Sequence, residues 1–276
     1  MAQVTRLDWI ARLGFFARAI VYILLGWVAL STRSKANEGQ NAVFETLRDM
    51  PLGQPLLILV GVGLFAYGLF RLFSAFLDLD HKGGGWKGLG KRAGQLFSAI
   101  AHFILGYTAF TYTSQLKQSQ GGDQKSQEAA QTILDLPLGP VLLGLVGVYF
   151  LIIAASQAYK AVQASFMDEI APDAPHVTRV LGRVGHAARA AVFAVIGWSI
   201  VQAALSQQEQ QAHAIGGALT SLRQNDTLYI LVAAGLIVFG LFSLLLARYR
   251  IIPRIDVGDA ARQGARKGEA ALHRSR

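Results

Sequence analysis

Six long apolar stretches, separated by polar segments, dominate the pattern of hydrophobic positions along the chain. They lie near Leu13–Leu30, Leu56–Leu77, Leu96–Tyr112, Val141–Ala158, Ala187–Leu205 and Leu228–Ala247. Each is close to the ~20 residues that an α-helix needs to cross about 30 Å of hydrocarbon. The pattern therefore predicts an all-α membrane protein with six transmembrane helices.

Three shorter segments with apolar residues at helical spacing come just before the second, fourth and sixth stretches. They cover Asn41–Met50, Ser126–Leu136 and Ala212–Gln224. In the first of them, Val43, Leu47 and Met50 recur on one helix face. We expect short amphipathic helices on the outer face of the bilayer. Two roles stay open for them: packing at the interface, which is the simpler one, or a lid over a central vestibule.

The first, third and fifth stretches carry the same residue types at fixed spacing. The shared positions are an arginine, a glycine, a polar residue, a ring, a second glycine and a terminal aromatic residue. In the three copies they are Arg12, Gly14, Arg18, Tyr22, Gly26 and Trp27, then Arg92, Gly94, Ser98, His102, Gly106 and Tyr107, then Arg183, Gly185, Arg189, Phe193, Gly197 and Trp198. An internal repeat of this kind indicates tandem structural units.

The second, fourth and sixth stretches repeat as well. The segment that starts at Pro51 matches the one that starts at Pro137 at nine of twelve positions. The third copy is weaker: Asn225 stands where the other two have the proline, and Gly235 stands where they have Gly61 and Gly147. Proline is tolerated at a helix start and asparagine caps helices, so we expect these residues to begin the even helices.

Three motifs together carry a resemblance to a known family. They are the opening Ala11-Arg12-x-Gly14-x-x-Ala17-Arg18-x-x-x-Tyr22, the entry Pro-Leu-Gly-x-x-Leu-Leu and the closing Ala247-Arg248-Tyr249-Arg250. The chain resembles, over almost its whole length, the domain-of-unknown-function 1206 family, whose bacterial members carry three tandem two-helix membrane units. The middle copy departs from the pattern at Ser98 and His102. The resemblance implies a fold and a location but no activity.

Two crossings per unit make the three units parallel repeats within a single membrane domain that spans residues 1–276. We place the repeats at 7–80, 87–167 and 178–250, related by a pseudo-threefold axis along the membrane normal, with a basic tail at 251–276. Small residues at spacing four, such as Gly94, Ser98 and Gly106 with His102 among them, predict a close contact between helices.

Composition and charge agree with this picture and orient it. Hydrophobic residues make up 53% and charged residues 16% of the chain, against roughly 25% charged in soluble domains. Of the 26 Lys and Arg residues, 20 fall on the side that holds both termini. Because basic segments stay in the cytoplasm, we expect a protein of the bacterial cytoplasmic membrane with both termini on the cytoplasmic side. The net charge of +9 then points to anionic lipid head groups rather than nucleic acid.

Polar residues inside the spans are the candidate ligand-binding or lipid-binding residues, because intramembrane charge is costly. The candidates are Arg18, Arg189, Arg12, Arg92, Arg183, Arg71, Tyr22 and His102. For the arginines two interpretations are open: anchors that snorkel to the head groups, the simpler one, or a basic vestibule that faces the cytoplasm. His102 is either a neutral partner in a helix contact or part of a proton relay, although no acidic residue lies deep in a span to pair with it.

Nothing in the sequence indicates catalysis, a metal or a cofactor. The chain has no cysteine, no G-x-S-x-G and no H-E-x-x-H, and its G-x-x-x-x-G-K motif at Gly85–Lys91 lacks the Ser or Thr of a phosphate loop. We therefore expect a protein that is not an enzyme and that organises lipid or partner proteins of unknown identity. The alternative is a channel or carrier for a small solute or anion along the pseudo-threefold axis.

Overall fold

The chain folds into helices throughout the residues that the computed structural model describes, which are 6–31, 39–78, 85–113 and 122–252. Six helices in this part of the chain are long and apolar enough to cross a membrane. They are α1 (Arg6–Ser31), α3 (Gly53–Leu77), α4 (Trp86–Thr113), α6 (Gly139–Gln163), α7 (Val177–Ser206) and α9 (Asp226–Tyr249). The prediction of an all-α protein with six membrane helices is confirmed. Nearly all of the basic tail at 251–276 lies outside the described residues.

The first helix begins earlier than its apolar stretch. It starts at Arg6 rather than near Leu13, so Arg18 lies near the middle of the helix, about 18 Å along its axis at 1.5 Å per residue. A charged residue in that position is far from either helix end. Its surroundings therefore decide whether it faces lipid or protein.

The three short helices form where the sequence predicts them, and two of them, α2 and α8, are largely buried. They are α2 (Gln40–Asp49), α5 (Gly122–Leu134) and α8 (Ile215–Leu222), with one-turn 3₁₀ helices η2 (Ser165–Glu169) and η3 (Glu209–Gln211) elsewhere. Val43, Phe44 and Leu219 are fully buried in one apolar core with the long helices. The expectation for Met50 is wrong, since it follows the helix and is exposed. α2 and α8 therefore pack into the protein, whereas α5 buries only Ala130 among its described residues and lies at the surface.

A tight corner leads from α2 into α3 and from α5 into α6. The helices α3 and α6 begin at Gly53 and Gly139, two residues after the prolines that we expected to begin them. The leucine before each glycine has a left-handed backbone, and a Cβ on either glycine would lie within 2.4 Å of a carbonyl oxygen of the preceding short helix. Only glycine allows this approach, which explains the Pro-Leu-Gly motif. In α9 the Asn225 side chain accepts a hydrogen bond from the Leu228 N–H at 3.0 Å and caps the helix, as predicted.

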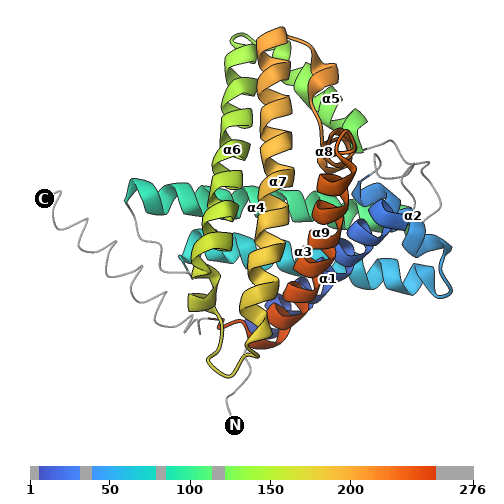
Figure 1. Cartoon of the computed structure of the whole chain (residues 1–276), viewed down its shortest axis with the longest axis vertical. Helices are drawn as coiled ribbons and strands as arrows, with labels where there is room; N and C mark the ends of the chain where they lie inside the picture. The colour runs from blue at the N-terminus through green and yellow to red at the C-terminus, as the bar shows by residue number, and fades with distance from the viewer. Residues whose placement is uncertain (1–5, 32–38, 79–84, 114–121, 253–276) are drawn as a thin grey trace, which may run out of the picture.

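The long helices follow one another in space in the order α4, α3, α1, α9, α7, α6. Figure 1 shows α6 and α7 side by side and upright, α3 and α4 lying across them, and α1 and α9 at intermediate angles. The helix directions therefore turn progressively from one end of this series to the other. This arrangement does not confirm the pseudo-threefold axis that the repeat predicts.

The contacts between successive units nevertheless repeat three times. In each, a glycine on the first long helix of a unit (α1, α4 or α7) packs on the second long helix of another unit (α9, α3 or α6). A Cβ on that glycine would lie 2.5 to 2.8 Å from its neighbour. The three glycines and their partners are Gly26 on Ala233 and Ile237, Gly106 on Phe65, and Gly197 on Leu151. Small residues let helix backbones approach in this way in lipid. Since α1 packs on α9, the last unit also contacts the first.

The contacts inside the units repeat only twice, and two aromatic residues explain why. Gly63 packs on Ala17 in the first unit, and Gly235 packs on Ala188 in the third. Gly235 therefore corresponds to Gly63, two residues from the position that the sequence comparison assigned to it. The middle unit has Tyr149 and Phe97 at these positions, with ring centroids 4.8 Å apart. Two rings in place of a glycine and an alanine hold α4 and α6 apart, and the symmetry is broken there.

Candidate functional site

Arg18 points into the protein and not toward lipid. Its side chain is 5% exposed. Its Nε donates to the Ser243 hydroxyl of α9 at 3.2 Å, and its Nη1 donates to the Tyr67 hydroxyl of α3 at 2.6 Å. The guanidinium carbon also lies 4.8 Å from the centroid of the Phe15 ring. Arg18 therefore does not occupy the position of a snorkelling anchor.

Arg189 lies near the same aromatic ring as Arg18. The guanidinium carbons of Arg18 and Arg189 are 5.1 and 4.6 Å from the centroid of the same Phe239 ring. Arg189 also stacks on Phe193, at 5.0 Å, and on Tyr22, at 5.6 Å. The structure thus brings together three of the predicted site residues, Arg18, Arg189 and Tyr22. Their common neighbour, Phe239, was not predicted.

Two more arginines approach the same aromatic cluster. The Nε of Arg71 donates to the Tyr67 hydroxyl at 2.8 Å, so this hydroxyl accepts from two guanidinium groups. Arg250 lies 5.4 Å from the centroid of Phe15 and makes an ion pair with Glu169 of η2 at 2.5 Å. A partly exposed carboxylate thus balances Arg250. No described carboxylate is paired with Arg18 or Arg189.

The three arginines that open the odd helices bind backbone carbonyls. Arg12 donates to the Ala247 and Arg248 carbonyl oxygens at 2.7 and 2.6 Å. The counterparts donate to the last turns of α3 and α6, from Arg92 to Ala75 and from Arg183 to Val162, each at 2.6 Å. The last carbonyls of a helix lack intrahelical partners and carry partial negative charge, which a cation stabilises. The structure therefore places Arg12, Arg92 and Arg183 at helix ends, apart from the Arg18 cluster.

His102 contacts the cluster through its ring. Its Nδ1 donates to the Ser98 carbonyl oxygen of its own helix at 2.6 Å, and its ring centroid is 4.5 Å from that of Tyr67. The expected hydrogen bond to another helix is replaced by one within α4. A similar buried pair that the sequence did not reveal joins His186 of α7 to Gln157 of α6 at 2.5 Å. His186 lies beside Phe166 of η2, which covers this end of the cluster.

A small cavity adjoins Arg189 on the other side of the cluster. Its walls come from α1, α7, α8 and α9 and consist of Tyr22, Arg189, Val192, Phe193, Ile215 and Leu236. It has room for about one water-sized particle. The Nε of Arg189 is buried without a hydrogen-bond partner, and so is the Nη2 of Arg18. Two cationic donors are thus unsatisfied in the interior of the protein.

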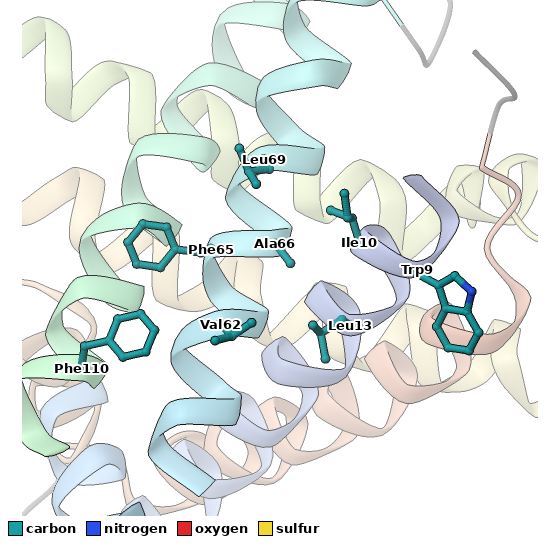
Figure 2. Close-up of a pocket in the computed structure, with 8 residues that line it drawn as sticks. All are labelled: Trp9, Ile10, Leu13, Val62, Phe65, Ala66, Leu69 and Phe110. Atoms are coloured by element: carbon teal, nitrogen blue, oxygen red, sulfur yellow. The ribbon is translucent and has the colours of Figure 1, made fainter. Parts of the chain in front are cut away.

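A second concavity, apolar and open, lies on the outside between α1, α3 and α4. Its volume is about 590 Å³, and it is lined by Trp9, Ile10, Leu13, Val62, Phe65, Ala66, Leu69 and Phe110. Figure 2 shows Phe65 and Phe110 at one end of this groove and Trp9 at the other. The groove has no charged side chain in its walls. Such a surface fits an apolar chain.

The candidate sites thus consist of guanidinium groups, aromatic rings and an apolar groove. Within the described residues no three His, Asp or Glu side chains are placed to hold a metal ion. Guanidinium groups and ring edges can bind an anion, and the groove can bind hydrocarbon. These two binding capacities are what the arrangement offers chemically.

Comparison with known proteins gives a family without an assigned activity. The chain is 31% identical over 249 residues, 87% of its length and 90% of the relative's, to "Uncharacterized protein YxxB" of Bacillus subtilis (strain 168). No solved structure matches the chain. A family model matches three tandem segments, residues 13–78, 93–164 and 184–250. With the three two-helix units described above, these matches show that the chain belongs to the family described as Domain of Unknown Function (DUF1206).

Proposed function

We propose that this protein organises lipid in the bacterial cytoplasmic membrane, by binding acyl chains in the groove between α1, α3 and α4. The observation that carries the proposal is the groove itself, with about 590 Å³ of space and an uninterrupted apolar lining. It opens on helices that are long and apolar enough to cross a membrane, so in a bilayer its contents are lipid tails. Trp9, 67% exposed at its end, belongs to the residue type that gathers at membrane interfaces.

A groove that binds an acyl chain should retain lipid when the protein is extracted in detergent. Val62→Trp places an indole in the groove, where Val62 is 45% exposed. The repeat provides a matched control in Val148→Trp, because Val148 occupies the same position in the second unit, is 47% exposed and is not part of the groove. We expect Val62→Trp to lose at least half of the phospholipid that co-purifies per protein, measured by native mass spectrometry. Equal lipid retention by the two variants would overturn the proposal.

Trp9 gives a second measurement that does not depend on retention. In a variant with the other three tryptophans replaced by phenylalanine, the fluorescence of Trp9 should be quenched by phospholipid brominated on its acyl chains. Because Val62→Trp would add a second tryptophan to this variant, Val62→Phe is the substitution that fills the groove here. If bromination near the head group and along the chain both leave Trp9 unquenched, lipid does not enter the groove.

The orientation and the partners belong to this proposal as well. The excess of basic residues on the side of both termini supports cytoplasmic ends, and the same residues favour contact with anionic head groups. We propose no nucleic-acid partner and no enzymatic activity. The alternative function, a channel or carrier for an anion or another small solute, is favoured by one observation only, the unpaired arginines beside Phe239.

A further inference from the structure

We propose that the cavity between α1, α7, α8 and α9 binds a single small inorganic anion of halide size, held by Arg189, with the charge of Arg18 nearby on the same Phe239 ring. This site is separate from the lipid groove and does not depend on it. Three features support it: the charge of two arginines, their unsatisfied N–H donors and the size of the cavity.

The charge of the two arginines has no counterpart within the described residues. Arg18 is 5% exposed and Arg189 is half-buried, and neither is paired with a carboxylate. Taking an ion out of water costs several kcal/mol unless a partner compensates it. Stacking on Phe239 and its neighbours returns only about 0.5–2 kcal/mol per cation. A bound anion would supply the missing negative charge.

The unsatisfied donors mark where that anion sits. Within the part of the chain that the structure describes, the Nε of Arg189 is buried without a hydrogen-bond partner, and Arg189 is the one cation in the cavity wall. The Nη2 of Arg18, whose guanidinium carbon lies 5.1 Å from the centroid of Phe239, is likewise without a partner among the described residues. An N–H group of a guanidinium can only donate, so its partner must accept. An anion accepts from every donor around it.

Size selects the kind of anion. The cavity has room for about one water-sized particle, which excludes a phospholipid head group. A buried water normally makes two to four hydrogen bonds and needs acceptors for its own protons. The side chains of this wall are Arg189, Tyr22 and four apolar residues, a poor set of acceptors. A monatomic anion needs only donors, and chloride is the abundant ion of this kind.

The α8 helix contributes one residue to the wall of the site. Ile215, its first residue, is part of the cavity wall, and the following residues Gly216–Leu219 are buried. A residue from a short connecting helix thus separates the arginine from the end of the protein where α2, α5 and α8 pack.

Binding can be measured directly on the purified full-length protein with radiolabelled chloride. We expect saturable binding that bromide displaces and that gluconate, too large for the cavity, does not. Binding should be at least tenfold weaker in Arg189→Gln, which removes the charge from the wall. Arg179→Gln, an exposed arginine on the same helix, should bind like the parent. Absence of saturable chloride binding in the parent, or displacement by gluconate, would overturn the proposal.

Thermal stability separates an anion site from a structural arginine. In sodium gluconate, the parent has an uncompensated charge, so Arg189→Gln should melt at the same temperature or higher. In sodium chloride the parent should gain stability with concentration, because a ligand that binds only the folded state stabilises it, and the variant should not. If Arg189→Gln melts lower than the parent by the same amount in both salts, Arg189 is structural and the proposal fails.

A second variant keeps both arginines and changes only the space. Val192→Leu adds one carbon to a buried residue of the cavity wall. We expect it to weaken chloride binding at least tenfold while the charge is unchanged. Unaltered chloride binding in this variant would show that the anion lies elsewhere, and would also contradict the proposal.

Discussion

The Tyr67 hydroxyl holds two guanidinium groups at once, those of Arg18 and Arg71, at 2.6 and 2.8 Å. This one oxygen atom is thus a hydrogen-bond acceptor for two arginines of the cluster. The tyrosine lies on α3, while Arg18 also bonds to Ser243 of α9. Three helices that are distant in sequence meet at this point.

We expect Tyr67→Phe to lower the free energy of unfolding by about 2 kcal/mol, because two buried cationic donors lose their acceptor. The measurement is equilibrium or thermal unfolding in detergent. Tyr159→Phe removes a hydroxyl from a residue that is 62% exposed and should change stability by less than about 0.5 kcal/mol. Equal effects of the two substitutions would mean that the Tyr67 hydroxyl is not an acceptor for buried charge.

Arg12 should act as a helix cap rather than as a ligand residue. Arg12→Ala removes two hydrogen bonds to the last carbonyls of α9 and should cost about 1–3 kcal/mol of stability. Retention of anionic lipid should not change, in contrast to the original interpretation of this residue as a binding candidate. Arg179→Ala serves as the control, and a loss of lipid without a loss of stability would contradict the capping role.

At the residue scale the sequence revealed which positions matter but not what they contact. The repeat singled out Arg12, Arg18 and Arg189 because identical residues recur at identical spacing. It could not assign their partners, since Ser243 and Ala247 are more than 220 residues away from the arginines they bind. The ring near both Arg18 and Arg189, Phe239, is one of 15 phenylalanines in the chain. No local pattern distinguishes it.

Single helices behave as the hydrophobic pattern predicts, whereas the small residues along them do not all serve one contact. Gly106 packs on Phe65 of α3, and a Cβ there would lie 2.5 Å from the ring. Gly94, on the same helix, has only the Tyr149 hydroxyl of α6 nearby, at 3.4 Å. The predicted stripe of Gly94, Ser98, His102 and Gly106 is thus divided between two neighbouring helices.

Gly106→Ala and Gly94→Ala should therefore have opposite effects. The first substitution forces α3 and α4 apart and should cost about 1–3 kcal/mol through overpacking. The second has space and should be neutral or stabilise by up to about 1 kcal/mol, because alanine favours helix over glycine. Both are compared by thermal unfolding in the same detergent. An equal loss of stability in both variants would contradict the close packing of Gly106 and the free space beside Gly94.

At the scale of the whole molecule, the middle unit differs from the other two in the contact between its own long helices. Tyr149 and Phe97 stand where the other units have glycine and alanine. The sequence comparison found that the middle copy departs from the pattern at Ser98 and His102, but it did not single out Phe97 and Tyr149. The consequence of two larger rings appears only when the helices are placed against one another.

Replacing these rings should close the middle unit. In Phe97→Ala combined with Tyr149→Gly, α4 and α6 should pack as α1 and α3 do. The chain has no cysteine, so Gly94→Cys with Ile153→Cys, at the positions that match Gly14 and Tyr67, reports the distance by disulfide formation, which requires Cα atoms within about 7 Å. We expect the disulfide with the double replacement and not with the native rings. A disulfide in both backgrounds would show that the rings do not hold the helices apart.

The orientation in the membrane is tested at the same scale. Single cysteines at Gln210 and Asp173 lie in exposed connections on opposite sides of α7. Because basic residues gather on the side of Asp173, the positive-inside rule predicts that only the cysteine at 210 reacts with an impermeant thiol reagent in intact cells. Labelling at 173 alone would reverse the proposed topology.

The contact between the first and last units sets an order of events during synthesis. Arg18 enters the membrane with the first helix, but its acceptor Ser243 follows 225 residues later. At roughly 5–20 residues per second, the ribosome needs about 10–45 s to supply it. During this interval a buried arginine has no α9 to bond with, and only Tyr67, available earlier, can accept from it. The first helix must therefore wait for its final position until the chain is almost finished.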